Sequence, residues 1–129
     1  LGFRGHDGWD GKENCFYLTA NGEADRIKGH ATRARWCHVG GQTGGKWGGI
    51  GVLCHPGNFR FPQPMRIHPS EPFFNFAPSQ TGDWEIKPDE DYVSRYRFVV
   101  TDGKPDAGLL ERQWRDYAHP PRVEVYAAE

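Results

Sequence analysis

Alternation of apolar and polar residues predicts that the chain is built mainly of short β-strands. The clearest alternation covers Tyr92–Thr101, in which one face carries tyrosine, phenylalanine and valine. Five further segments have the β-rich composition of strands: Cys15–Thr19, Arg26–Val39, Lys46–Cys54, Gly82–Ile86 and Val123–Tyr126. The pattern therefore indicates a succession of strands separated by turns.

Helix and turn signals complete this pattern. Only Pro105–Tyr117 has apolar residues at helical spacing, with Asp106 as the expected N-cap. Turns are expected at Ala20–Asp25 and Gly40–Gly45, and the glycines within Lys46–Cys54 indicate a bulge or the close approach of another backbone. Together these elements predict an all-β fold, an antiparallel β-sandwich with one short helix, in a single domain over residues 1–129.

The segment Val52–Ala77 does not fit a simple succession of strands and turns. It contains five X-Pro steps, and the residue before each proline is held out of the helical region. It also carries five phenylalanines together with groups that can hydrogen-bond or titrate. Long irregular loops are usually functional or disordered, and the phenylalanines argue against disorder. We therefore expect an ordered, extended loop that builds a site over the β scaffold.

Composition narrows the classes of function. The chain has 129 residues and a formal net charge of -1, so no basic excess favours nucleic-acid binding. No apolar run approaches the ~20 residues that a membrane-spanning helix needs. Because the chain begins with Leu1 rather than methionine, we expect a processed, trimmed or partial chain. The odd set of Cys15, Cys37 and Cys54 is expected to be free and buried, which leaves the compartment open.

Four arginines occupy regular positions in the predicted strands. Arg33 and Arg35 share one strand face, and Arg95 and Arg97 share a face of a later strand. They could lie on a solvated outer face, where their stems cover neighbouring apolar residues. Alternatively, they could form a polar concave face that binds hydroxyl or carboxylate groups through the guanidinium fork. The histidine- and asparagine-containing loop nearby favours the second interpretation.

The central segment supplies the candidates for acid/base chemistry. His55, His68 and Glu71 could act as general acid and base, because histidine titrates near neutral pH. The alternative is that Glu71 pairs with Arg66 and braces the loop. The sequence has no closely spaced His or Cys pair of the kind that binds zinc, so neither a metal nor another cofactor is expected. A metal-dependent enzyme that uses both histidines and a carboxylate is a third hypothesis.

Several runs of residues resemble a known bacterial family. These runs are ARWCHVGG, GIGVLCHPGNFRFPQPMRIHP, EPFFNFAPSQ and YVSRYRFVVTDG. Their most specific parts are the HPxN-type motif at His55, Pro56 and Asn58, and the RYR run from Arg95 to Arg97. Over nearly its whole length the chain is similar to the PmoA-like family, which is also labelled methane oxygenase-like.

This resemblance implies a β-sandwich similar to the aldose-mutarotase-like supersandwiches and a carbohydrate-related role. It also implies that the chain is the C-terminal half of a larger sandwich. A missing N-terminal half or a second chain would then cover apolar residues that are otherwise exposed, such as Trp36, Trp47 and Phe98. In this chain Cys54 stands where the family usually has aspartate, and Met65 where it has tryptophan. A periplasmic or secreted location is expected, with the cytoplasm left open.

The first functional hypothesis is therefore a sugar-processing or sugar-binding domain. Its small-molecule or oligosaccharide ligand would lie on the polar face beneath the central segment. The candidate ligand-binding residues are Arg33, Arg35, Trp36, Asn58, Arg60, Arg66, Asn75, Arg95 and Arg97. The second hypothesis is a non-catalytic interaction or structural module, in which the same residues brace the fold or bind a partner.

Overall fold

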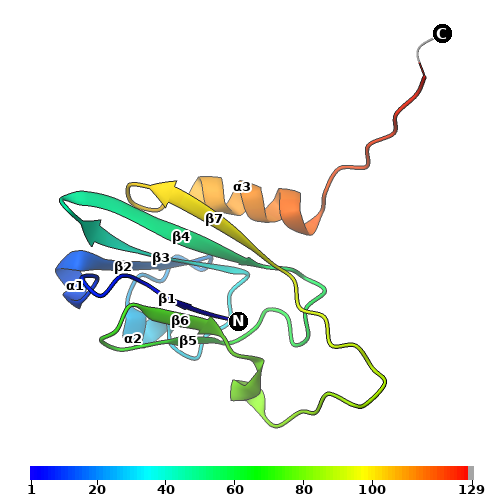
Figure 1. The fold of residues 1–129 in the computed structure, drawn as a ribbon, viewed down its shortest axis with the longest axis horizontal. Coiled ribbons are helices and arrows are strands. Elements are labelled where there is room, and N and C mark those ends of the chain that lie inside the picture. The colour runs from blue at the N-terminus through cyan, green and yellow to red at the C-terminus, as the bar shows by residue number, and fades with distance from the viewer. Residues whose placement is uncertain (128–129) are drawn as a thin grey trace.

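The computed structural model describes residues 1–127, and two antiparallel sheets pack in it as a sandwich (Figure 1). The smaller sheet has the strand order β1-β6-β5, with β1 at Gly2–Arg4, β6 at Phe73–Phe76 and β5 at Met65–Ile67. The larger sheet has the order β2-β3-β4-β7, with strands at Cys15–Thr19, Trp36–Thr43, Lys46–Cys54 and Tyr96–Asp102. The predicted antiparallel β-sandwich is confirmed.

One long helix, α3 (Ala107–Ala118), lies on the outer face of the four-stranded sheet (Figure 1). The carboxylate of Asp106 accepts a hydrogen bond from the backbone N–H of Leu109 at 2.9 Å, which confirms the predicted N-cap. Three short helical segments are α1 (Gly11–Asn14), α2 (Arg26–Gly29) and η1 (Pro78–Thr81). Within residues 1–127, none of the helices has the length and apolarity needed to cross a membrane.

Two apolar layers hold the sheets and the helix together. Between the two sheets lie buried side chains such as Val52 and Phe74. Between the four-stranded sheet and α3, Trp36 and Leu53 pack with Leu110. The expectation that Trp36 is exposed is wrong, because helix α3 covers this residue and leaves it 2% exposed.

The three cysteines, Cys15, Cys37 and Cys54, are free and buried, as the sequence predicts. All three lie in the layer between the sheets. Burial raises the pKa of each thiol above its ordinary value. The cysteines therefore stay neutral near pH 7 and behave as small apolar residues.

Several predicted strands differ from the structure. Arg26–Val39 begins as helix α2, because the carboxylate of Asp25 accepts hydrogen bonds from the first N–H groups of the helix. Strand β3 then starts only at Trp36, and strand β7 starts at Tyr96 rather than at Tyr92. Two further predictions are wrong, because these described segments form no strand: Gly82–Ile86 and Val123–Tyr126.

The expected long loop over Val52–Ala77 is wrong in part, because its second half is a β-hairpin. Strands β5 and β6 pair in antiparallel register from Met65 opposite Phe76 to Ile67 opposite Phe74. These four apolar side chains are buried, so the hairpin is held by the inward face of its own strands. The irregular parts are the connection at residues 55–64 and the hairpin turn at residues 68–72.

Glycines in strand β4 allow close packing on the sheet. A Cβ atom at Gly51 would lie 2.5 Å from Cδ2 of Leu110, and a Cβ atom at Gly49 would lie 2.5 Å from Cε1 of His38. The Cβ atom at Gly49 would also lie 2.7 Å from the backbone oxygen of Val39, so the predicted close approach of another backbone is confirmed. Strands β3 and β4 pair without interruption from Trp36 to Thr43, so the alternative of a bulge is wrong.

His38, on strand β3, is a buried titratable group. Its Nε2 lies 3.3 Å from Oγ1 of Thr101, and its Nδ1 has no hydrogen-bond partner in the described part of the chain. Burial lowers the pKa of His38 from 6.5 to about 4, because the imidazolium would lose its contact with water. Between about pH 6.5 and pH 4, His38 is therefore protonated in the unfolded chain but neutral in the folded chain. The stability from the neutral ring is complete above pH 6.5 and is lost as the pH falls toward 4.

We expect the free energy of unfolding to fall by about 2 kcal/mol between pH 7 and pH 5 because of His38. Urea denaturation at a series of pH values measures this change. The variant His38→Gln cannot titrate, so its stability should depend much less on pH in this range. An equal dependence in the wild type and the variant would contradict the assignment.

Strand β7 lies at an open edge of the sandwich. Its second side has no paired strand among residues 1–127. Tyr96, at the start of the strand, stacks on Phe76 of the opposite sheet. Further along the same face, Phe98 is 46% exposed and Val100 is 80% exposed. The three-stranded sheet therefore covers only the first part of β7.

Candidate functional site

Three predicted ligand-binding residues brace the connection at residues 55–64. The side chain of Asn58 donates to the backbone oxygen of Arg95 at 2.7 Å and accepts from its backbone N–H at 2.7 Å. The guanidinium of Arg60 donates to the carbonyl oxygens of Pro78 and Gly82. That of Arg33 donates to the carbonyl oxygens of residues 60 and 62. The structure thus gives these three side chains bracing contacts within the fold.

Arg35 and Trp36 fasten helix α3 to the sheet. Both donate to Oε2 of Glu111, at 2.9 Å from Nε of Arg35 and 3.0 Å from Nε1 of Trp36. Burial alone would raise the pKa of Glu111, but the hydrogen bonds from Trp36 and Arg35 outweigh it and lower the pKa. The guanidinium of Arg35 also lies 5.3 Å above the ring of Trp114. Both residues therefore interact with α3 rather than with an open concave face.

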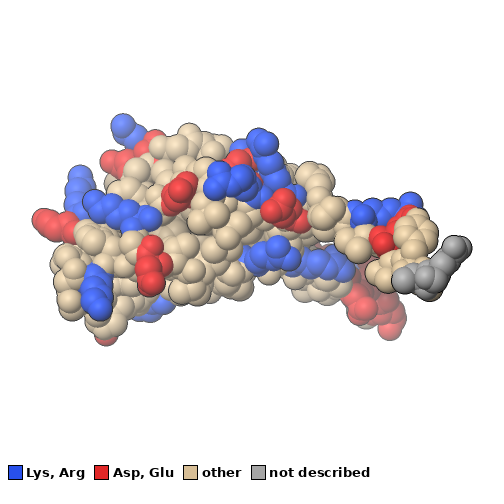
Figure 2. All heavy atoms as spheres, turned by 90° about the horizontal axis from the view of Figure 1, so that it is seen from above, with Lys and Arg blue, Asp and Glu red and all other residues tan. Residues whose placement is uncertain are grey.

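His55 lies with Arg97 near the C-terminal end of α3. The guanidinium of Arg97 lies 4.5 Å above the ring of Tyr117, and the ring of His55 meets the same tyrosine edge-on at 5.3 Å. Figure 2 shows the α3 side of the molecule, on which acidic side chains are interspersed with basic ones. The arginines therefore form no single broad basic surface on this side.

Arg66 and Asn75 lie opposite each other on strands β5 and β6. Their side chains are directed away from the core, since their strand neighbours are the buried ones. Arg66 is exposed, whereas Oδ1 of Asn75 is buried without a partner among the described residues. Asn75 lines a cavity of about 560 Å³, and Trp84 and Tyr92 also line this cavity.

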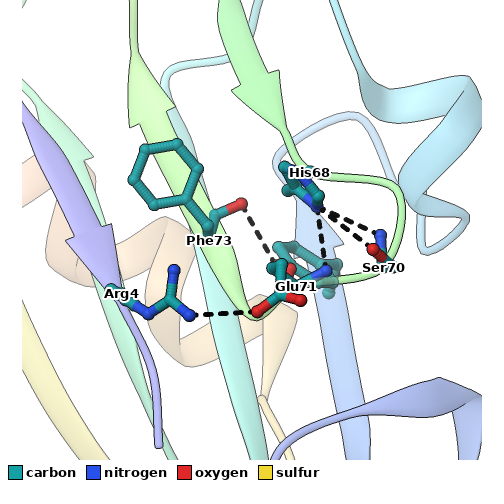
Figure 3. Close-up of polar contacts among 6 residues, drawn as sticks. Arg4, His68, Ser70, Glu71 and Phe73 are labelled. Carbon is teal, nitrogen blue, oxygen red and sulfur yellow. Dashed lines mark hydrogen bonds and ion pairs between the residues drawn. The ribbon is translucent and has the colours of Figure 1, made fainter. Parts of the chain in front are cut away.

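The turn at residues 68–72 is held by a network of polar contacts (Figure 3). Nδ1 of His68 accepts hydrogen bonds from the backbone N–H groups of Ser70 at 3.3 Å and Glu71 at 2.9 Å. The carboxylate of Glu71 forms an ion pair with Arg4 at 3.0 Å. His68 thus contacts the backbone of Glu71, and the carboxylate binds Arg4. The predicted brace between Glu71 and Arg66 is wrong, because Arg4 on strand β1 is the partner.

The two candidate histidines lie at different ends of the sandwich. The connection that contains His55 is at the right of Figure 1, beyond the end of β4, and the turn that contains His68 is at the left. The structure therefore does not bring His55, His68 and Glu71 together in one site. Over residues 1–127, no group of three or more His, Cys, Asp or Glu side chains could hold a metal ion.

A cavity of about 480 Å³ lies beside the 68–72 turn, between that turn, strand β2 and helices α1 and α2. Its volume falls in the range of small-molecule sites. The ring of Tyr17 gives it an aromatic wall, and Pro69 and Ser70 come from the turn. Its other polar or charged lining residues are Lys12, Cys15, Asp25 and Arg26.

Arg26 is the most unusual side chain of this cavity. It is only 8% exposed, and its guanidinium lies 5.0 Å above the ring of Tyr17. Its Nη1 is buried and has no hydrogen-bond partner among the residues that the structure describes. No carboxylate in this part of the chain forms an ion pair with it. An arginine is rarely buried without a partner, so this side chain marks the cavity as a candidate binding site.

The sequence-based hypothesis missed both Arg26 and Tyr17. Arg26 falls in a segment that was predicted to be a strand, and Tyr17 falls in a strand with nothing to distinguish it. A signal for α2 does exist, since Asp25 is a favourable N-cap. It could have placed Arg26 in a helix, but not beside the turn at residues 68–72.

The tyrosine beneath Arg26 is itself held in place by the turn. Its hydroxyl group lies 3.2 Å from the carbonyl oxygen of Glu71 and 3.3 Å from that of Phe73 and donates to these acceptors. Burial raises the pKa of Tyr17 far above its usual value. The tyrosine therefore stays neutral near pH 7 and cannot balance the charge of Arg26.

Comparison with known proteins gives a family but no function. No curated protein and no solved structure matches the chain. A family model described as a family of unknown function (DUF6807) matches residues 1–115, which is most of the chain and includes every strand of the sandwich. The chain therefore belongs to the DUF6807 family.

Proposed function

We propose that this domain binds a small carbohydrate-related ligand in the cavity beside the 68–72 turn. The observation that carries the proposal is the combination of about 480 Å³ of space, the aromatic Tyr17, and a rim with hydroxyl and charged groups. Aromatic side chains give apolar contact area to a sugar ring, and the polar rim can hydrogen-bond its hydroxyl groups.

The resemblance to the PmoA-like family supports the choice of a carbohydrate. We propose that DUF6807 shares the supersandwich-like ancestry and carbohydrate-related role implied by that resemblance. In this proposal the chain corresponds to the C-terminal half of a larger sandwich. Binding in a periplasmic or secreted location fits the same proposal.

Binding, rather than catalysis, is the function that the site geometry supports best. The carboxylate of Glu71 is engaged by Arg4, and Nδ1 of His68 accepts backbone hydrogen bonds. A general acid and base must both reach the same substrate, and the connection after β4, which contains His55, lies at the other end of the sandwich (Figure 1). The proposal therefore assigns no catalytic step to these three residues.

The experiment is a thermal-shift screen of neutral monosaccharides, oligosaccharides and sugar acids. A ligand at about 100 times its Kd should raise the free energy of unfolding by about 2.7 kcal/mol. Ser70→Trp should fill the mouth of the cavity and remove the shift. Ser79→Trp is the matched control, because Ser79 is exposed in η1 and does not line this cavity. No shift with any sugar, or equal shifts in both variants, would refute this site.

A second candidate function is an interaction module that a further chain covers at strand β7. The observation that favours it is the exposure of Phe98 and Val100 on a strand with a free edge. Unpaired strand edges and contiguous exposed apolar groups are typical of association surfaces. We propose a second copy of this chain as the partner, pairing antiparallel through the free edge of β7 in a register centred on Val99, which would place Phe98 opposite Val100 of the other copy.

We expect the wild-type chain to self-associate as its concentration rises. The double variant Phe98→Lys with Val100→Lys should remain a monomer with a melting temperature close to that of the wild type, because Val100 is 80% exposed and Phe98 is 46% exposed. Size exclusion with light scattering measures both proteins. A wild type that stays monomeric at high concentration would contradict a second copy as the partner.

A further inference from the structure

We infer that Arg26 makes the cavity selective for a ligand with a single carboxylate, such as a sugar acid. This inference rests on the proposal that the cavity binds a small ligand, and it adds the charge and the anchoring residue. The argument begins from the guanidinium itself. It is 8% exposed, it borders the cavity, and its Nη1 is buried without a partner in the described chain.

Groups of the protein near Arg26 do not satisfy its charge. The closest aromatic contact is the ring face of Tyr17, which attracts a cation but accepts no hydrogen bond in the fork geometry. The tyrosine hydroxyl points to the carbonyl groups of Glu71 and Phe73. Cys15 is buried with a raised pKa, so its thiol is neutral near pH 7.

The nearest acidic residue in sequence is already engaged. Oδ1 of Asp25 accepts hydrogen bonds from the N–H groups of Ile27 at 2.8 Å and Lys28 at 3.1 Å, and so caps helix α2. The hydrogen bond from Lys28 contributes most to lowering the pKa of Asp25, and the one from Ile27 contributes next. The carboxylate of Asp25 therefore stays charged. Among the described residues it forms no ion pair with Arg26. A buried charge without a partner is costly, and a bound carboxylate would remove this cost.

Charge and shape favour a carboxylate over a phosphate. The cavity lining contains two cations, Lys12 and Arg26, and one anion, Asp25, so its net charge is +1. This charge balances a monoanion, whereas a phosphate dianion would keep an excess negative charge beside Asp25. The guanidinium fork matches the two oxygens of a carboxylate.

The test compares glucose, glucuronate and glucose 6-phosphate by calorimetric titration of the whole chain. We expect glucuronate to bind at least about 10-fold more tightly than glucose, in line with a charge-assisted hydrogen bond. Arg26→Gln should remove this preference, and Arg26→Lys should restore part of it, because lysine keeps the charge without the fork. Lys28→Gln is the matched control, since it removes a positive charge from the same helix at a residue outside the cavity.

Stability without ligand separates a binding role from a structural one. Because Nη1 of Arg26 is buried without a hydrogen-bonding partner among the described residues, Arg26→Met should raise the melting temperature of the free protein by about 3 °C or more. A structural arginine would give the opposite result. A lower melting temperature for Arg26→Met would therefore overturn the inference, even if the loss of glucuronate binding were observed.

The remaining outcomes distinguish this inference from the proposed function. Equal affinity for glucose and glucuronate would overturn the carboxylate selectivity and leave sugar binding in place. Tightest binding of glucose 6-phosphate would overturn the choice of a monoanion. If none of the three probes binds and the broader sugar screen also gives no shift, both proposals fail together.

Discussion

Replacing Gly49 with alanine is expected to destabilise the domain by about 3 kcal/mol or more, through overpacking of a rigid site. A Cβ atom there would lie 2.5 Å from Cε1 of His38, 2.7 Å from the carbonyl oxygen of Val39 and 2.8 Å from Cα of Gly40. Two of these are backbone atoms of the neighbouring strand, which cannot move without breaking the β3–β4 ladder. Urea or thermal denaturation monitored by circular dichroism measures the loss.

The adjacent glycine gives a matched control for Gly49. A Cβ atom at Gly48 would meet only the carbonyl oxygen of Thr101, at 3.6 Å, which is an ordinary contact. Gly48→Ala should therefore change the free energy of unfolding by less than about 1 kcal/mol. Because both substitutions restrict the unfolded chain alike, the difference between the two variants reports the contacts of residue 49 in the folded state. A similar loss in both variants would show that the His38 pocket is not the cause.

Asn58→Ala is expected to cost about 3 kcal/mol, because it removes two hydrogen bonds to the backbone of Arg95 and leaves the N–H of Arg95 without its partner, while the carbonyl oxygen of Arg95 keeps its bond from the N–H of His55. The asparagine is 5% exposed, and its side chain satisfies both the N–H and the carbonyl oxygen of Arg95 at 2.7 Å each. It thus ties the connection after β4 to the segment that enters β7. The free energy of unfolding from urea titration measures the effect.

Two variants test this account of Asn58. Asn58→Asp keeps the acceptor for the N–H of Arg95 but loses the donor to its carbonyl oxygen, so an intermediate loss is expected. Asn21→Ala is the exposed control, since Asn21 makes a single hydrogen bond to the carbonyl oxygen of Arg33, and about 1 kcal/mol or less is expected. If Asn58→Ala kept full stability but weakened sugar binding, the original assignment of Asn58 to ligand binding would be restored.

The candidate site is formed by segments that are far apart in the sequence, so the sequence predicted only one part of it. The prediction placed the site in the segment from Val52 to Ala77, and one part of that segment, the 68–72 turn, does border the cavity that contains Arg26. The rest of that cavity comes from α1, β2 and the segment that contains α2, more than forty positions earlier in the chain. Tyr17 contacts the backbone of Glu71 across 54 positions. No periodic pattern in the sequence carries that information, because it records only neighbours along the chain.

The contacts of the arginines also depend on segments that are distant in the sequence. Sequence alone left open whether Arg33, Arg35 and Arg97 bind a ligand or brace the fold. Each pairs with groups far along the chain: Arg35 with a carboxylate 76 positions away, Arg33 with carbonyl groups nearly thirty positions away, and Arg97 with the ring of Tyr117. Arg26, the one arginine among residues 1–127 with an unsatisfied buried nitrogen, could not be recognised from its neighbours in sequence.

By itself, the sequence determined the elements whose causes are local. Period-two alternation and β propensity placed β2, β4 and most of β7, the Asp106 cap and helical spacing placed α3, and the apolar surroundings of the cysteines predicted that they are buried. Only the tertiary structure decided which side chains are satisfied, which glycines accommodate a neighbour, and where a cavity remains. These properties depend on contacts between distant segments, and a side chain left without a partner is visible only when all of its neighbours are in place.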